Sequence, residues 1–331
     1  MTSRTLIAGL FALLALGARA GDFSDDPAAR AFIDRMVKVH GLDRTEVTAL
    51  IDAAQRKDSI LSAISRPAEA KPWHEYRPIF VNRARIDGGL AYWDTHEALL
   101  DRVAERLQVD PAYIVAIVGV ETRYGQHAGR FRVLDALATL AFAYPPRSRF
   151  FTGELEQFLL LTREERVDPR EALGSYAGAM GHGQFIPSSY RRYAIDFDGD
   201  GRRDLWHSDP DILGSVANYL KVHGWEYGGP VAVRARLEGE RPGELLAAGL
   251  KPHLPAARLA EWGVIPETPL ADDRPVGLIE LAGADGPEYW VTCNNFHVVT
   301  RYNRSPLYAM AVHQLAQAIA AEQANRDTFA E

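Results

Sequence analysis

One glutamate, Glu121, ends an apolar stretch that covers residues 113–120. On a helix, Glu121 shares a face with Val118 and Ile117, because residues three and four positions apart align. A carboxyl on an apolar face loses hydration, which favours its protonated form. Such a group can act as a general acid, for example by protonating the leaving oxygen in glycoside cleavage. The alternative is a structural glutamate paired with a cation such as Arg123.

Residues 174–190 form a second unusual segment, with four glycines and no Asp, Glu, Lys or Arg. Glycines let a backbone approach a ligand closely, and Ser175, Gln184 and the tyrosines offer neutral hydrogen-bonding groups. Neutral donors and acceptors beside aromatic rings suit a sugar better than a phosphate. A flexible loop between helices is the alternative, but Tyr, Met, Phe and Ile are too frequent here for a solvated loop.

An acidic segment that begins at Asp196 matches the template of a calcium-binding loop. The residues at loop positions 1, 3, 5, 6 and 9 are Asp196, Asp198, Asp200, Gly201 and Asp204. Position 12 normally holds a glutamate but is His207 here, so Asp209 or Asp211 would have to supply that ligand. We expect calcium at this loop, in a structural role.

A fourth segment, residues 294–304, contains three asparagines and two aromatic residues, Phe296 and Tyr302, where a predicted strand runs into a helix cap. These side chains fit the lining of a cleft. They fit equally well as turn residues and core aromatics, and the segment by itself favours that second interpretation.

Helical patterns dominate the first two thirds of the chain. Asp43 and Glu46 form a capping box, Asp94 with Glu97 predicts another helix start, and Asp110 precedes a proline suited to a first helical turn. The predicted helices cover about 27–55 with a stop at Gly41, 94–108, a stretch from 111, 132–143, 149–163, 187–194, 210–223 and 307–323. Residues 65–90, with three prolines and the Gly88–Gly89 pair, are predicted to be mainly a connecting segment.

Strand patterns appear only after residue 228. Residues 230–237, 276–283 and 288–300 alternate apolar and polar side chains, and residues 284–286 between the last two predict a hairpin turn. The expected fold class is therefore mainly α, of the α+β type, with a small β-rich insertion before the last helix.

Composition limits the function classes. The 331 residues are 47% hydrophobic and 24% charged, which excludes disordered, collagen-like and disulfide-scaffold chains. The net charge of −7 argues against a nucleic-acid partner. Cys293 is the one cysteine, so the chain forms no internal disulfide, and we expect this thiol to be buried and inert.

Residues 1–20 have the pattern of a cleaved signal peptide. Arg4 precedes an apolar run over residues 6–16, and residues 18–20 read Ala-Arg-Ala, a small-x-small cleavage site. The run is too short to span a bilayer, and the alternative is a buried N-terminal helix. Because no cysteine is near the cleavage site, we expect an exported protein without a lipid or membrane anchor.

Together these segments resemble the lytic murein transglycosylase B family, whose members cleave bacterial peptidoglycan with a lysozyme-like catalytic domain. The resemblance is carried in order and spacing by residues 119–125, 175–181, 184–190, 196–206, 214–219 and 300–303. It covers most of the chain after residue 20.

The resemblance implies a role for individual residues. Glu121 would be the catalytic acid and then the base, breaking the bond between N-acetylmuramic acid (MurNAc) and N-acetylglucosamine (GlcNAc) and leaving 1,6-anhydro-MurNAc ends. Ser175, Gln184 and Tyr302 would contact the glycan, and Arg147 would contact the stem peptide. The implied calcium ligands are Asp196, Asp198, Asp200, the carbonyl of Arg202 and Asp211.

The resemblance also implies a periplasmic monomer that acts on glycan strands and stem peptides and needs no organic cofactor. Its layout would be a signal peptide (1–20), a helical N-terminal part (21–93), a lysozyme-like core with the calcium loop (94–228), a β-rich domain (229–290), a return segment lining the cleft (291–304) and a C-terminal helix (305–331). The other functions that we consider are a hydrolytic muramidase and a non-catalytic peptidoglycan-binding protein.

Overall fold

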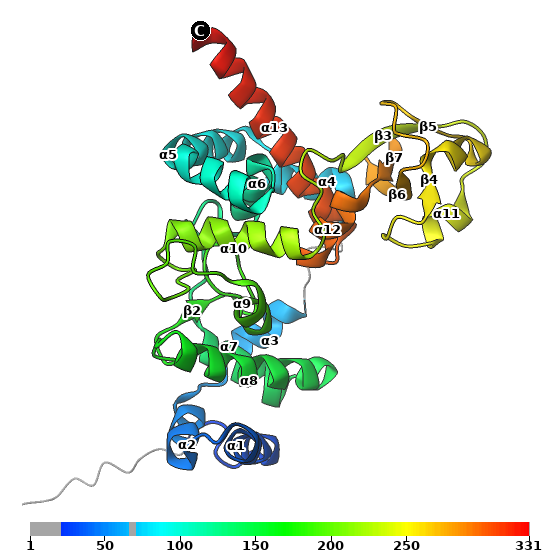
Figure 1. Cartoon of the computed structure of the whole chain (residues 1–331). Coiled ribbons are helices and arrows are strands. Elements are labelled where there is room, and N and C mark those ends of the chain that lie inside the picture. Colours follow the sequence, from blue (N-terminus) through cyan, green and yellow to red (C-terminus); the bar gives the residue numbers. More distant parts are fainter. Residues whose placement is uncertain (1–20, 66–70, 331) are drawn as a thin grey trace, which may run out of the picture. The chain divides into compact units, whose positions relative to one another are not determined.

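A computed structural model describes residues 21–65 and 71–330; the expected signal peptide at 1–20 lies outside these residues (Figure 1). The α-helices are α1 (Pro27–His40), α2 (Arg44–Ala53), α3 (Asp58–Ile64), α4 (Trp73–Phe80), α5 (Arg83–Leu107), α6 (Pro111–Thr122), α7 (Val133–Ala143), α8 (Ser148–Glu164), α9 (Pro187–Tyr193), α10 (Asp209–Val222), α11 (Gly243–Ala247), α12 (Asn294–Tyr302) and α13 (Pro306–Ala330), with 3₁₀ helices η2 (Pro145–Arg147) and η3 (Ala256–Trp262). The strands are β1 (Phe131–Arg132), β2 (Leu173–Gly174), β3 (Ala232–Leu237), β4 (Leu254–Pro255), β5 (Val264–Pro266), β6 (Pro275–Gly283) and β7 (Gly286–Thr292). The mainly helical chain with a small β region confirms the predicted fold class.

The chain forms two compact units, which divide after Gln55. The first unit contains α1 and α2. As predicted, α1 stops at Gly41, whose left-handed φ of 65° suits a residue without a side chain, and the Asp43 carboxylate caps α2 by accepting from the N–H of Glu46 at 2.9 Å. All other elements belong to the second unit.

Helix α6 is the buried centre of the helical part of the second unit. It contacts α5, α10 and α13 (Figure 1), and every residue from 114 to 120 is buried. A helix that is apolar on all faces is stable only inside a protein. Helices α7, α8 and α9 pack in sequence, α7 on α8 and α8 on α9.

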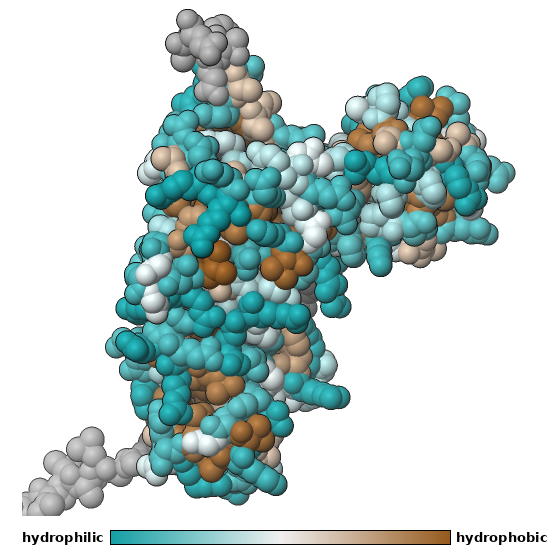
Figure 2. Space-filling view, viewed as in Figure 1, coloured by the Kyte–Doolittle hydropathy of each residue, from teal (hydrophilic) through white to brown (hydrophobic). Residues whose placement is uncertain are grey.

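Hydrophilic side chains predominate on the face of the chain drawn in Figure 2.

The prediction of a connecting segment over 65–90 is wrong, because α4 and the first part of α5 occupy most of it. Helix α5 begins after Asn82, whose side chain accepts from the N–H of Arg85 at 3.0 Å, so Asp94 does not cap its start. The helix is kinked at His96, whose φ of −117° and ψ of 15° are not helical, and it ends before Gln108 as predicted. Gly89 is a packing residue: a Cβ there would be 2.4 Å from Ile319 and 2.7 Å from the hydroxyl of Tyr124. Close helix packing, and not a turn, therefore accounts for the glycine pair.

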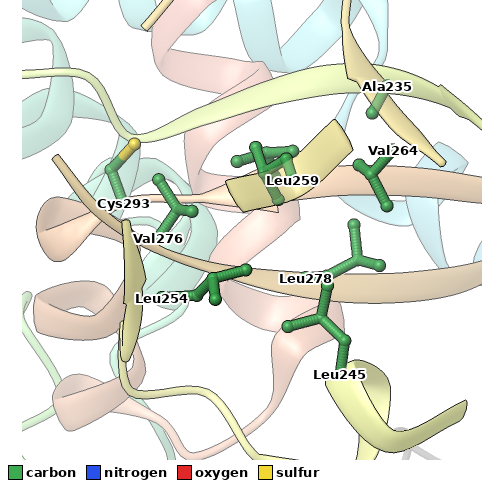
Figure 3. Close-up of a cluster of buried hydrophobic side chains, with 9 residues drawn as sticks. Ala235, Leu245, Leu254, Leu259, Val264, Val276, Leu278 and Cys293 are labelled. Atoms are coloured by element: carbon green, nitrogen blue, oxygen red, sulfur yellow. The ribbon is translucent and has the colours of Figure 1, made fainter. Parts of the chain in front are cut away.

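A five-stranded sheet in the order β4-β6-β7-β3-β5, with antiparallel neighbours throughout, forms the β region. The predicted strands at 230–237 and 276–283 and the hairpin turn between β6 and β7 are confirmed. One side of the sheet packs on a cluster of buried aliphatic residues that includes Cys293 (Figure 3). Cys293 is fully buried, as predicted, and this burial raises the pKa of its thiol to about 11, which favours the unreactive protonated form.

The predicted strand over 288–300 is correct only as far as Thr292, where β7 ends, because the chain then continues as α12. Helical spacing there buries Phe296 and Val299. The side chain of Asn295 accepts from the N–H of Glu226 at 2.8 Å and donates to the Glu226 carbonyl at 2.7 Å. Asn294 and Asn295 are therefore the first residues of α12 and not turn residues, and Asn295 ties α12 to the loop that follows α10.

None of the helices in the described ranges is both long enough and apolar enough to cross a membrane.

Candidate active site

Glu121 lies next to the C-terminal residue of α6, Thr122. Arg123 and Tyr124 follow with left-handed backbone, φ 53° and 60°, so the chain turns sharply away from the helix axis. The hydroxyl of Thr122 secures this turn by donating to the carbonyl of His182 at 2.9 Å. The carboxyl of Glu121 is thus fixed at the negative end of the helix dipole, where an additional negative charge is disfavoured.

Tyr308, in the first turns of α13, holds the carboxyl of Glu121 in position. Its hydroxyl donates to Oε1 of Glu121 at 2.6 Å, and the residue is 3% exposed. Burial, together with the charge of Glu121 and the neighbouring Tyr302, raises the pKa of Tyr308 well above its usual value. Tyr308 therefore keeps its proton and remains a donor. Sequence analysis missed this residue, since no motif or spacing links it to Glu121, 187 positions earlier.

Glu121 lines a cavity of about 930 Å³. The other lining residues are Arg147, Phe150, Phe151, Ser175, Tyr176, Ala177, Ala179, Gln184, Phe185, Ile186, Ser188, Ser189, Arg192, Tyr193, Tyr219, His223, Arg301, Tyr302, Asn303 and Arg304. The structure thus brings together the five residues predicted for catalysis or substrate contact. Among these lining residues of the described chain, Glu121 is the one with a carboxylate.

The uncharged segment 174–190 is an ordered wall of this cavity and not a flexible loop. The hydroxyl of Ser175 accepts from the N–H groups of Ala177 and Ala179, at 3.3 and 3.0 Å. The side chain of Gln184, whose φ is 51°, donates to the carbonyls of Ala128 and Gly181, at 3.1 and 2.9 Å. These bonds fix two of the predicted substrate-contacting side chains before any ligand binds.

Aromatic rings form another part of the wall. The hydroxyl of Tyr302 donates to the carbonyl of Gly183 at 2.6 Å, and its ring contacts Phe185 and Tyr219 with centroids 5.6 and 4.7 Å apart. Tyr302 is therefore locked between the uncharged segment and α10. Tyr219 falls within a motif of the family, but its place at the cavity could not be read from spacing alone.

Positive charge surrounds the cavity. The guanidinium of Arg147 lies 4.5 Å from the ring centre of Phe150, a cation–π contact that holds it at the rim. Arg192, Arg301 and Arg304 also line the cavity. With four arginines against one carboxylate, the cavity has a local charge opposite to that of the whole chain, and an acidic polymer can approach it.

Three acids of the predicted calcium loop converge. One carboxylate oxygen each of Asp196, Asp198 and Asp211 lies within 4.8 Å of the others. Burial raises the pKa of Asp211, which is 1% exposed, and the charges of Asp198 and Asp196 raise it further. A bound cation would relieve this repulsion, so an all-oxygen donor set of this kind fits calcium. Asp200 and Arg202 lie on the same loop outside that cluster, with Asp200 accepting from the N–H of Arg202 at 2.8 Å.

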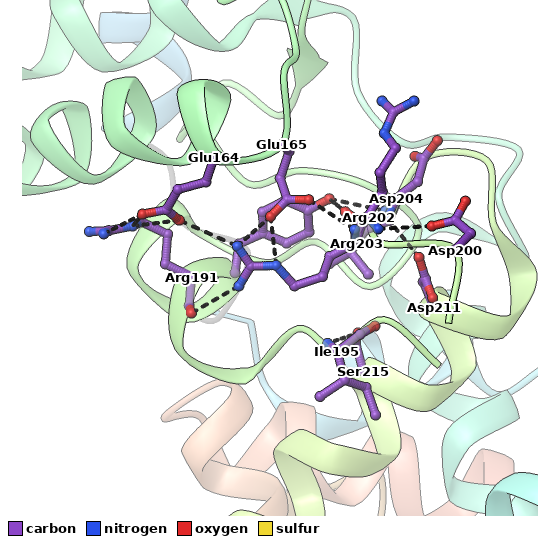
Figure 4. Close-up of polar contacts among 12 residues, drawn as sticks. Glu164, Glu165, Arg191, Ile195, Asp200, Arg202, Arg203, Asp204, Asp211 and Ser215 are labelled. Carbon is purple, nitrogen blue, oxygen red and sulfur yellow. Dashed lines mark hydrogen bonds and ion pairs between the residues drawn. The ribbon is translucent and has the colours of Figure 1, made fainter. Parts of the chain in front are cut away.

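Ion pairs attach the acidic loop, and α9 just before it, to the C-terminal end of α8 (Figure 4). Nε of Arg203 donates to the carboxylate of Glu165 at 2.6 Å, and the backbone N–H of Arg203 donates to the same group at 2.9 Å. Arg191 pairs with Glu164 at 2.6 Å. Asp211, at the start of α10, accepts from the N–H groups of Phe197 and Asp204, both at 2.8 Å. The loop is thereby anchored to the helices that carry the cavity wall.

Residues 24–317 match the Transglycosylase SLT domain family. The membrane-bound lytic murein transglycosylase B of Escherichia coli (strain K12) is 46% identical over 311 residues, which cover 91% of this chain and 84% of that protein.

Among solved structures, the soluble lytic transglycosylase SltB1 from Pseudomonas aeruginosa is similar with a TM-score of 0.85 and 46% identity, over 90% of this chain and 100% of that one. The Escherichia coli lytic transglycosylase Slt35 in complex with calcium has a TM-score of 0.84 and 45% identity, over 92% and 96%. The chain therefore belongs to the Transglycosylase SLT domain family and is a lytic transglycosylase, an enzyme that cleaves peptidoglycan.

Proposed function

We propose that Glu121 alone provides the acid and the base for cleavage of the β-1,4 bond between MurNAc and GlcNAc. It first gives its proton to the glycosidic oxygen, the bond from that oxygen to C1 of MurNAc breaks, and GlcNAc leaves as an alcohol. The Glu121 carboxylate then takes the proton of the MurNAc C6 hydroxyl, whose oxygen bonds to C1 and closes the 1,6-anhydro ring. No water is consumed, and Glu121 is again protonated.

The observation that carries this proposal is that Glu121 is the one carboxylate among the described residues lining the cavity. Glycosidases that use water or a covalent intermediate place two carboxyl groups about 5–10 Å apart across the scissile bond. An attack by the substrate's own hydroxyl needs no second carboxylate. Tyr308 supports the first half-reaction, because its hydroxyl stabilises the negative charge that develops on Glu121 as the proton leaves.

The remaining wall residues would bind the substrate. We assign Ser175, Gln184 and Tyr302 to the sugars, since their neutral polar groups lie in the same cavity as Glu121. We assign Arg147 to the stem peptide, because a guanidinium pairs with the carboxylates of that peptide.

We also propose a structural calcium ion held by Asp196, Asp198, Asp200, the Arg202 carbonyl and Asp211. The convergence of three of these carboxylates supports the site, and the calcium complex of the similar Slt35 structure agrees with it. When bound, the ion would neutralise the clustered acids and fix the loop against α10. Export to the periplasm, through residues 1–20, would bring the enzyme to its polymer.

The test is a digest of purified cell-wall sacculi followed by mass spectrometry of the muropeptides. We expect anhydro products from the unchanged protein and none from Glu121→Gln, which keeps an oxygen that can accept from Tyr308 but cannot transfer a proton. Products one water heavier would refute the proposal in favour of a hydrolytic muramidase. Binding of sacculi without any cleavage by the unchanged protein would favour a non-catalytic binding role.

A further inference from the structure

His223 lines the same cavity as Glu121, and neither the motifs nor the mechanism uses it. It follows α10 directly, and its ring is stacked on that of Tyr219, with centroids 4.2 Å apart and planes 26° from parallel. Tyr193, from α9, packs on the other two rings, 4.9 Å from His223 and 4.8 Å from Tyr219. The imidazole therefore has one defined orientation in the cavity wall.

The hydrogen bonds of His223 decide which of its ring nitrogens carries the proton. Nδ1 lies 2.7 Å from the backbone carbonyl oxygen of Tyr219. A carbonyl can only accept, so Nδ1 must be the protonated nitrogen, and Nε2 of the neutral ring is then an acceptor. Within residues 21–65 and 71–330, Nε2 of His223 has no hydrogen-bond partner, and it is not one of the buried polar atoms that lack a partner.

The surroundings of His223 favour the neutral form of its ring. Burial lowers the pKa of His223, and the positive charges of Arg301 and Arg192 lower it further, against the opposing effect of the Tyr219 carbonyl. The titratable or charged groups that face the ring are Arg301 and His297 from α12, Arg192 and Tyr193 from α9, and Tyr219 from its own helix. Because arginine side chains only donate, Nε2 offers an acceptor in a part of the wall that is rich in donors.

We propose that Nε2 of His223 accepts a hydrogen bond from a sugar O–H or N–H of the glycan bound in the cavity. This makes His223 a substrate-binding residue, and the ring contacts with Tyr193 and Tyr219 hold its imidazole in place. The inference rests on the proposed function, because it takes the glycan as the ligand of this cavity. Loss of one such bond to a neutral group weakens binding by roughly three- to tenfold.

Kinetics on solubilised glycan strands test the inference with His223→Phe, which keeps an aromatic ring, and His223→Gln, whose side-chain oxygen can occupy the place of Nε2. We expect KM to rise roughly three- to tenfold with unchanged kcat for the Phe variant, and little change for the Gln variant. His297→Phe is the matched control, since this histidine is nearby on α12 but does not line the cavity. An unchanged KM in the Phe variant, or an equal rise in both His223 variants, would overturn the inference.

A second measurement leaves His223 intact. Nitrogen-15 NMR of histidine-labelled Glu121→Gln protein should show the Nε2 resonance of His223 shifting when chitopentaose binds. A resonance that stays in place while chitopentaose is bound contradicts the proposal. A shift with cello-oligosaccharides as well assigns the donor to a hydroxyl, and a shift with chitopentaose alone assigns it to the acetamido N–H. Both readouts are separate from the product masses, so a failure of the anhydro mechanism would be recognised independently.

Discussion

Replacing Tyr308 by phenylalanine removes the hydroxyl that contacts the carboxyl of Glu121 and leaves the ring in place. The hydroxyl lies 2.6 Å from Oε1, and the tyrosine is 3% exposed, so water cannot readily replace the lost donor. In the first half-reaction, negative charge develops on Glu121 as its proton leaves. The Tyr308 hydroxyl should therefore stabilise the transition state more than the ground state.

The size of the effect follows from the kind of bond. A hydrogen bond to a charged group contributes about 1.5–3 kcal/mol. If most of this is realised in the transition state, kcat falls roughly 10- to 100-fold while KM stays nearly constant. The phenylalanine variant should retain the fold, because only one oxygen atom is removed from the side chain.

The assay is release of anhydro muropeptides from sacculi, with thermal unfolding measured on the same samples. Tyr113→Phe is the matched control. Tyr113 is on α6, it does not line the cavity, and its hydroxyl lies 2.7 Å from Nδ1 of His313. We expect the control to lose some stability but to keep its kcat. A folded Tyr308→Phe enzyme with kcat within twofold of the unchanged protein would refute this account of Tyr308.

Three further predictions concern stability. Chelation of calcium should lower the melting temperature by several degrees, because an ion at a hundredfold excess over its dissociation constant contributes about 2.7 kcal/mol to the free energy of unfolding. Added calcium should reverse this change, and the Asp211→Asn variant should not show it. A melting curve that is insensitive to the chelator would count against the site. Burial lowers the pKa of His313 to about 4, so the folded chain resists protonation that the unfolded chain accepts near pH 6.5. The free energy of unfolding should therefore fall by roughly 3 kcal/mol as the pH drops from about 6.5 to about 4. Urea unfolding of the His313→Gln variant should depend less steeply on pH, and an equally steep dependence would contradict this prediction. Gly89→Ala should lower the free energy of unfolding by about 1–3 kcal/mol, because its Cβ would clash with Ile319, and an unchanged urea midpoint would show that the helices can separate there.

Local sequence signals predicted those elements whose ends are set by nearby residues. The cap at Asp43 and the stop at Gly41 involve partners a few positions away, and the strands of the β6–β7 hairpin alternate visibly around a tight turn. The failures have a tertiary cause. The glycines at 88 and 89 resemble turn residues until Tyr124 and Ile319 are seen to pack against them.

The same division applies to the site. Glu121, the uncharged segment and the acidic loop could be found because each is unusual within a short window, where a carboxyl ends an apolar run or acids recur at every second position. Tyr308 and His223 could not, because a tyrosine at the start of a helix and a histidine after one are both ordinary locally.

The sequence alone thus determined the fold class, the family and the residues with unusual local surroundings, since helical periodicity, caps and motif spacing are properties of neighbouring residues. Only the tertiary structure decided which groups meet. It placed Tyr308 of α13 on the carboxyl of α6, brought Asp211 to the loop that starts at Asp196, and gathered the arginines around one cavity in a chain of net negative charge. Hydrogen bonds and charge interactions act over a few ångströms of space, and separation along the chain does not determine that distance.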